Sequence, residues 1–395
     1  MGIMTNFADK LELIIKTMYK TQGLKNSRIE VADALRGLAV IGIVIYHAVE
    51  HMNTSGPTPT LSFSWDNDFF HYLGVIVAGK AYGIFAILFG LSFFIQRDNQ
   101  EQKGKDFSLR FLWRMFLLLI FGTINVAIFD GDILQAYAII GVLLIPAGYL
   151  SNKWLWAITI FLLLQPLEII TYFTGWQVCG WDAAQWGVIG DAHINGSFWE
   201  NCWVDLTVAP INNWVFYLLT GRATQTLGLF YLGLLFGRYR LFYNEGNNLK
   251  IWRIVFIITL ITTLVGNNID LGFGAQRGEP SLSPILTPMM KAGQTLCYIS
   301  GAVLMWYAFD WFKKAFKHIC FFGRMSLTNY LMSSVLGSFI FYGWGLGMCL
   351  VLGTFWSFWV GVGIVVFQII VLYQWDKHHQ RGPLETLWRN LTWCW

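Results

Sequence analysis

The chain has 395 residues, of which 55% are hydrophobic and only 13% are charged, with a mean hydropathy of +0.50. Soluble domains carry about 25% charged residues, so this composition excludes an ordinary soluble protein and indicates a polytopic helical membrane protein. The formal net charge of +4 does not indicate nucleic-acid binding, because the basic residues lie in short loops and tails. The six cysteines show no spacing typical of metal ligands, and we expect no metal site.

The first segment, residues 1–27, is polar and mildly amphipathic. It is typical either of a helix that lies on the membrane surface or of a loose basic tail. No cleavage pattern of small residues precedes the first apolar stretch, so we expect this stretch to act as a signal anchor.

Ten apolar stretches follow, each long enough to cross a bilayer as a helix. They cover approximately residues 33–50, 69–95, 107–128, 133–150, 154–173, 222–238, 250–267, 286–309, 325–342 and 346–373. A weaker segment, 209–220, brings the chain back to the membrane after a long loop at 174–208. We therefore expect an all-α fold with a transmembrane domain over 28–373 and a tail over 374–395.

The basic residues predict the orientation. The loops at 51–68, 129–132, 174–208 and 342–345 contain no Lys or Arg. Lys and Arg instead gather in the loops after every second span and in the tail, as at Arg97, Lys103, Lys105, Lys153, Arg238, Arg240, Lys313, Lys314, Lys317, Lys377 and Arg381. By the positive-inside rule, we expect both termini in the cytoplasm, which suits a multi-pass protein of a cell's inner (cytoplasmic) membrane.

The loop at 174–208 then faces outward. It contains Cys179 and Cys202, which are either bridged or free thiols in an oxidising compartment. It also places five Trp residues among four carboxylates, which is typical either of sugar recognition or of an interfacial lid.

The first span carries two ionisable residues, Arg36 and His47. They are eleven positions apart, which at about 100° per residue puts both side chains on one helix face, about 16 Å apart along the axis. Ionisable groups inside a membrane are costly and commonly functional. Arg36 suits an anionic ligand, or it snorkels to lipid phosphates; His47 suits a general base, or it is an ordinary interfacial histidine.

Other polar residues fall within the predicted spans. Lys80 lies in the second span and serves the site or a structural ion pair, while Asp132 either caps a helix or orients His47. Further candidates for a ligand path are Lys291, Gln294, Arg324 and Asn329.

Several of these residues belong to motifs. The run Asp33–Ala39 resembles the D-x-x-R-G-x-A opening of the transmembrane acyltransferase superfamily, and Arg36 with His47 resembles the R-x10-H pair of its acyltransferase type 3 branch. The rest of the chain resembles the YeiB family, a bacterial family of unknown function, in which Asn often stands at the position of His47. The YeiB-like motifs are Gly79-Lys80 with Leu88–Gly90, Gly131–Leu134 with Tyr137-Ala138, Gly323–Leu331, and Gly382–Glu385 with Leu387–Arg389.

The resemblance implies transfer of an acyl group, often acetyl, from cytoplasmic acetyl-CoA or another acyl-CoA to a hydroxyl or amine of a glycan or lipid-linked envelope molecule. His47, oriented by Asp132, would then be catalytic, and Arg36, Lys80 and Arg324 would contact the donor. Lys291, Gln294 and Asn329 would line the substrate path. The alternative function is a transporter of a small anionic or lipidic solute, and a homodimer remains an open question.

Overall fold

The structure is a computed structural model that describes residues 26, 28–52, 58–266 and 282–394. This part of the chain is helical and holds no β-sheet; one isolated bridge pairs Leu61 with Leu352. The all-α expectation is confirmed. The predicted amphipathic segment, 1–27, lies almost entirely outside the described residues.

Every predicted span coincides with one helix or with two consecutive helices. They are α2 (Glu30–Met52), α3 (Asp66–Ile76) with α4 (Lys80–Glu101), α5 (Ser108–Val126), α6 (Leu134–Gly141) with α7 (Leu144–Tyr149), α8 (Asn152–Leu163) with α9 (Pro166–Thr174), α13 (Arg222–Arg238), α14 (Asn248–Gly266), α15 (Ser283–Ala308), α18 (Ser326–Phe341) and α19 (Thr354–Asp376). The weaker segment forms α12 (Ala209–Leu219).

Among the described residues, five helical segments could cross a membrane by length and composition, or six if the bent pair α8–α9 is one span. They are α2, the segment Asp66–Glu101 that contains α3 and α4, α5, α14 and α19. The structure thus shows a helical protein with several membrane-compatible helices, whereas the count of ten spans and the orientation of the termini stay predictions.

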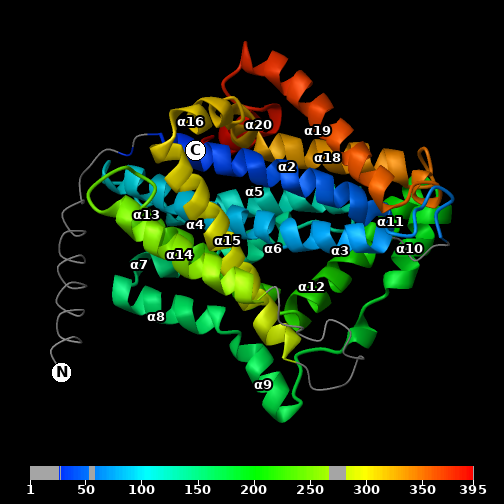
Figure 1. Cartoon of the computed structure of the whole chain (residues 1–395), viewed down its shortest axis with the longest axis horizontal. Coiled ribbons are helices and arrows are strands. Elements are labelled where there is room, and N and C mark those ends of the chain that lie inside the picture. The colour runs from blue at the N-terminus through cyan, green and yellow to red at the C-terminus, as the bar shows by residue number, and fades with distance from the viewer. Residues whose placement is uncertain (1–25, 27, 53–57, 267–281, 395) are drawn as a thin grey trace.

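The remaining elements cover the two ends of α2 (Figure 1). Near its C-terminal end, the predicted loop 174–208 is largely helical, with η2 (Trp181–Ala183), α10 (Trp186–Asn195) and α11 (Phe198–Thr207). α11 begins at a capping box formed by Ser197 and Glu200, a local signal that the loop expectation overlooked. The other short elements are α16 (Asp310–Lys317), α17 (Cys320–Arg324), η3 (Met348–Leu350) and α20 (Pro383–Thr392).

α2 lies at the centre of the bundle, in contact with α4, α17, α18 and α19 (Figure 1). Its approach to α17 depends on two glycines. A Cβ at Gly37 would lie 2.8 Å from the Ile319 carbonyl oxygen, and one at Gly323 would collide with the Asp33 carbonyl. The motifs at 33–39 and 323–331, far apart in sequence, therefore pack together at one end of α2.

α4 and α13 cross at a second pair of glycines, so that their backbones touch. A Cβ at Gly90 would meet the Phe230 carbonyl oxygen, and one at Gly233 would meet the Ile87 carbonyl oxygen. We expect Gly233→Ala to destabilise the protein by about 1–3 kcal/mol, because the added methyl forces these two backbones apart. The melting temperature in detergent measures this effect. Gly363→Ala is the control, since its Cβ meets nothing within 4 Å; equal melting temperatures would contradict the close crossing.

The break between α3 and α4 explains the Gly79-Lys80 pair. Gly79 adopts a φ of +81°, which favours glycine, and a Cβ there would lie 2.6 Å from Lys291 Cδ. Lys80 Nζ donates at 3.1 Å to the Gly74 carbonyl at the end of α3, which also accepts from Ala78 N at 3.0 Å. The buried lysine thus holds the break together.

Candidate functional site

Two neighbouring cavities occupy the helical bundle. The inner cavity has a volume of about 270 Å³ and includes Arg36 in its lining. The outer cavity has a volume of about 540 Å³ and includes His47 in its lining. Four residues line both cavities: Ile43, Tyr82, Ile133 and Tyr330. We call these four residues the partition.

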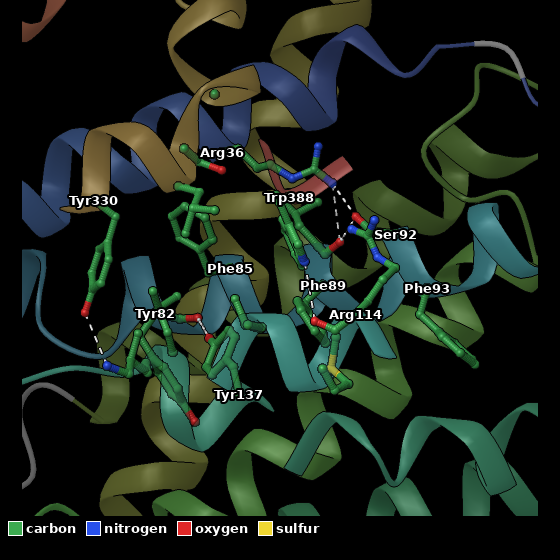
Figure 2. Close-up of a pocket in the computed structure, with 18 of the residues that line it drawn as sticks. Arg36, Tyr82, Phe85, Phe89, Ser92, Phe93, Arg114, Tyr137, Tyr330 and Trp388 are labelled. Carbon is green, nitrogen blue, oxygen red and sulfur yellow. Dashed lines mark hydrogen bonds between the residues drawn. The ribbon is translucent and has the colours of Figure 1, made fainter. Parts of the chain in front are cut away.

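The inner cavity combines a cationic end with an aromatic body. Arg36, Arg114 and Arg324 line it, and none of its described lining residues is Asp or Glu. In Figure 2, Arg36 and Arg114 lie toward one end, and Tyr330 lies at the other, with aromatic side chains such as Phe85 between them. An elongated ligand with an anionic head and a less polar arm matches this lining.

Arg36 is held in place from two sides. Its Nη1 donates to Asp33 Oδ1 at 3.2 Å, and its Nη2 donates to Ser92 Oγ on α4 at 2.5 Å. Arg36 and Ser92 also line a third cavity of about 390 Å³, together with Asn26 and Arg28. The guanidinium therefore stands where this third cavity and the inner cavity adjoin.

The two other arginines are positioned by the C-terminal part of the chain. Arg324 donates to Asp376 Oδ1 at 2.6 Å, at the end of α19. The Arg114 guanidinium lies 4.2 Å from the ring centroid of Trp388, which lines the inner cavity from α20. The tail segment 374–395, predicted to be separate from the transmembrane domain, thus supplies one wall of this cavity.

Glu385 fastens α20 to the bundle. Its carboxylate accepts hydrogen bonds from Leu327 N at 2.7 Å, Thr328 N at 3.1 Å and Thr328 Oγ1 at 2.6 Å, and so caps the N-terminus of α18. Burial raises the pKa of Glu385, although the bonds from Thr328 oppose this shift.

We expect Glu385→Ala to cost about 1–2 kcal/mol of stability, since it removes this cap, and to loosen the Trp388 wall. Thermal unfolding in detergent measures the loss. Glu101→Ala is the matched control, because Glu101 is exposed and pairs only with Arg97 one turn away. A melting temperature as high as that of the control would argue against the cap.

The outer cavity gathers three of the predicted residues, His47, Asp132 and Lys291. His47 Nε2 lies 3.9 Å from Glu50 Oε2, and the imidazole packs 4.7 Å from the Phe129 ring centroid. In the described part of the chain, His47 Nδ1 is buried without a hydrogen-bond partner. A buried imidazole nitrogen of this kind is available to a ligand or a water molecule.

Both carboxylate oxygens of Asp132 accept hydrogen bonds from residues close to it in the sequence. Its Oδ1 accepts from Asn125 Nδ2 at 2.8 Å, and its Oδ2 accepts from Gln135 N at 3.0 Å, which caps α6. No hydrogen bond joins it to His47 among the described residues, and the carboxylate nearest to this imidazole in an ion-pair contact is Glu50. The geometry favours the capping alternative, while a role in orienting His47 stays a prediction.

Three predicted residues line neither cavity. Lys80 caps α3 as described above. Asn329 is buried. Its side-chain amide donates to the Phe322 carbonyl at 3.0 Å, and its backbone carbonyl accepts from Gln368 Nε2 at 2.9 Å. Gln294 is buried within α15. The predicted contacts of these three residues with the donor or the substrate therefore stay predictions.

Other residues at the site escaped the sequence reasoning. Glu50 lies three positions after His47 and so shares its helix face, a spacing that could have revealed it. Tyr330 lies in a quoted motif, and its hydroxyl accepts from Ile133 N at 3.2 Å. Arg222 and Arg114 carried no local signal, because only the fold brings them to the cavities.

α10 and α11 lie near the His47 end of α2. Trp186 of α10 lines the outer cavity, and His193 bonds to Asp205 Oδ1 at 3.0 Å, joining α10 to α11. Burial opposes a charge on His193, but its bond to the Asp205 carboxylate raises its pKa above the ordinary value. Cys179 and Cys202 are both free.

The fold and the two adjoining cavities define a helical membrane protein with a cationic pocket that meets a histidine-bearing one. Residues 28–185 match the family model "Heparan-alpha-glucosaminide N-acetyltransferase, catalytic", and residues 236–395 match "Protein of unknown function (DUF418)". The first match makes the N-terminal part of the chain acyltransferase-like.

Relatives match along nearly the whole chain. The uncharacterized protein YxaH of Bacillus subtilis (strain 168) is 26% identical over 93% of this chain and 95% of its own length. The uncharacterized protein YeiB of Escherichia coli (strain K12) is 24% identical over 91% of this chain and 95% of its own length. The chain is thus a YeiB-like protein with a transmembrane acyltransferase-like domain.

Proposed function

We propose that this protein is a multi-pass membrane acyltransferase that moves an acyl group, most simply acetyl, from an acyl-CoA to a hydroxyl or amine. One observation carries the proposal: a cavity lined by three arginines adjoins a cavity lined by His47, and both share the partition. The acyltransferase-like match over residues 28–185 supports the same reaction class.

The donor fits the inner cavity by its chemistry. Arg36, Arg114 and Arg324 pair with the phosphates of the CoA moiety, each guanidinium offering several N–H donors in one plane. The less polar arm of the donor follows the aromatic body past Phe85 and Phe89. The thioester then reaches the partition, next to the His47 cavity.

His47 acts as the general base. As the acceptor oxygen or nitrogen attacks the thioester carbonyl, a neutral imidazole takes its proton; the new C–O or C–N bond forms, the C–S bond breaks, and the proton passes to the leaving thiolate. Such a positioned base is worth about 10²–10⁴ in rate. Glu50, 3.9 Å away, favours the transient imidazolium.

The acceptor fits the outer cavity. Trp186, Phe216 and Tyr217 line it beside Asn213. Aromatic faces with a few polar groups are typical of glycan binding, so a glycan or lipid-linked envelope molecule is the proposed acceptor. In this arrangement the termini are cytoplasmic, the membrane is the bacterial inner membrane, and α10 and α11 face outward.

A second candidate function follows from the same cavities. Because they share the partition, they also suit passage of a small anionic or lipidic solute from one side to the other. Incubation of the purified protein with [¹⁴C-acetyl]-CoA and an envelope extract separates the two functions. Radiolabel appearing covalently on an extract component supports acyl transfer. Solute uptake into proteoliposomes, with no labelled product, supports transport.

The partition predicts selectivity for the acyl chain. The Tyr330 hydroxyl accepts from Ile133 N, and Tyr82 is held by Thr226, so both rings are fixed between the cavities. We expect Tyr330→Ala to raise the rate with octanoyl-CoA relative to acetyl-CoA by about tenfold or more, since each methylene that gains room is worth about 1–3 kcal/mol. Competition between the two donors measures this ratio. Tyr330→Phe, which keeps the ring, is the control, and an unchanged ratio in Tyr330→Ala would place the acyl group elsewhere.

A further inference from the structure

The outer cavity carries two cations that the proposed reaction does not use. Arg222 lies at the start of α13, and Lys291 lies in α15. Both line the cavity, and they lie close enough to repel each other. Two neighbouring cations in one cavity are costly unless an anion lies between them or nearby.

Neither cation is in an ion pair within 4 Å among the described residues, although Arg222 lies near enough to Glu50 to attract its carboxylate. Within residues 28–52, 58–266 and 282–394, the Arg222 guanidinium and the Lys291 ammonium form no hydrogen bond or ion pair. Arg222 instead lies 5.2 Å from the Tyr82 ring centroid and 5.3 Å from that of Phe216. These aromatic faces hold the guanidinium in position without occupying its N–H donors.

Two helix N-termini add to the positive potential. α4 begins after Gly79 and α13 begins after Gly221, both with positive φ and without a side-chain cap. Gly79 and Arg222 line the outer cavity, so the positive ends of two helix dipoles lie beside the two cations. Lys291 crosses the start of α4, since its Cδ takes the space of a Gly79 Cβ.

The carboxylates of the cavity come from other elements. Glu50 faces His47 from α2, and Asp132 is used by Asn125 and Gln135. Asp130 lies in the same turn as Asp132 and forms no ion pair within 4 Å among the described residues. The acids therefore come from α2 and the turn after α5, whereas the cations come from α13 and α15.

We propose that the outer cavity binds an anionic acceptor, a phosphorylated or carboxylated alcohol or amine, whose anionic group pairs with Arg222 and Lys291 while its nucleophile faces His47. This inference rests on the proposed function and adds the chemical class of the acceptor. An uncharged sugar would leave Lys291 without an anion at ion-pair distance and Arg222 with only the more distant Glu50, and the cavity would then hold the two cations at a cost.

Binding of small anionic probes to the full-length protein in detergent tests the inference. Calorimetric titration at constant ionic strength uses sn-glycerol 1-phosphate and glucuronate as probes, with glycerol and glucose as their uncharged counterparts. We expect at least one anionic probe to bind tighter than its uncharged counterpart. The anionic probe with the higher affinity then indicates whether the acceptor carries a phosphate or a carboxylate. Equal binding of charged and uncharged probes would overturn the inference.

Variants locate the anion. Arg222→Gln and Lys291→Gln are each expected to weaken the anionic probe about tenfold or more, because each removes a charge-assisted hydrogen bond. Lys313→Gln, an exposed cation on α16, is the matched control and keeps wild-type affinity. Unchanged affinity in both cavity variants would show that the probe binds elsewhere and would overturn the proposal.

Acetyl-CoA binding, measured on the same samples, separates this inference from the proposed function. If Arg222→Gln and Lys291→Gln lose binding of the anionic probe but keep binding of acetyl-CoA, the result supports both the anion site and the proposed function. If the wild type binds the anionic probe through Arg222 and Lys291 but no acyl-CoA, the anion site stands and the acyltransferase fails. If acetyl-CoA binds and the probes do not discriminate charge, only the acceptor class is wrong.

Discussion

His47→Gln is expected to lower the rate of acyl transfer by about 10²–10⁴-fold, the loss of a positioned general base. Glutamine keeps a polar side chain beside Glu50 and Phe129 but cannot take a proton from the acceptor. The donor binds in the other cavity, so its affinity should change little. Single-turnover transfer from [¹⁴C-acetyl]-CoA measures the rate, and calorimetry measures the donor affinity.

His71→Gln is the matched control. His71 lies exposed on α3 and lines neither cavity, so its variant should keep the wild-type rate. A His47→Gln protein that transfers acetyl as fast as the His71→Gln protein would show that the imidazole is not the base.

Arg36→Gln is expected to weaken acetyl-CoA binding by about tenfold to more than a hundredfold. A hydrogen bond to a charged group is worth about 1.5–3 kcal/mol, and Arg36 offers several donors to a phosphate. The fold should persist, because Asp33 keeps its second partner, Arg28 Nε, at 2.9 Å. Calorimetric titration of acetyl-CoA measures the change.

The control for this loss is a cation outside the cavities. Arg253→Gln removes an exposed arginine of α14 and should leave acetyl-CoA binding unchanged. An equal loss of acetyl-CoA affinity in both variants would show that the effect comes from the net charge of the protein and not from a contact of Arg36 with the donor. An unchanged affinity in Arg36→Gln would remove Arg36 from the donor site.

The helices were largely predictable because membrane-compatible helices need long apolar runs, and such runs are visible in one sequence. The breaks inside them were harder to predict. The α3–α4 break depends on Gly79 in a positive-φ conformation and on Lys80 reaching the Gly74 carbonyl, contacts that no hydropathy pattern contains. The loop at 174–208 was expected to lack helices, and its capping box shows that a local signal was overlooked.

The site was predictable only along single helices. The spacing of Arg36 and His47 predicts a shared face of α2, and the structure places Arg36 in the lining of the inner cavity and His47 in that of the outer cavity. Partners from distant segments were not predictable. Arg114 and Trp388 meet because α20 packs against both α5 and α18, and Arg222 reaches the His47 cavity through the packing of α13.

Lys80 shows why a polar residue within a span is weak evidence by itself. A buried lysine needs an acceptor, and a backbone carbonyl beside a helix break supplies one, so a structural role satisfies the same physical demand as a ligand. The distinction required knowledge of which backbone carbonyl lies within reach of the Lys80 ammonium group.

The most direct test of the central claim is an electron cryo-microscopy structure of the full-length protein with acetyl-CoA bound. We predict the phosphates of the donor beside Arg36, Arg114 and Arg324, and the thioester at the partition, facing His47. Phosphates bound in the outer cavity, or a thioester separated from His47 by an intact partition, would contradict the proposed path of the acyl group.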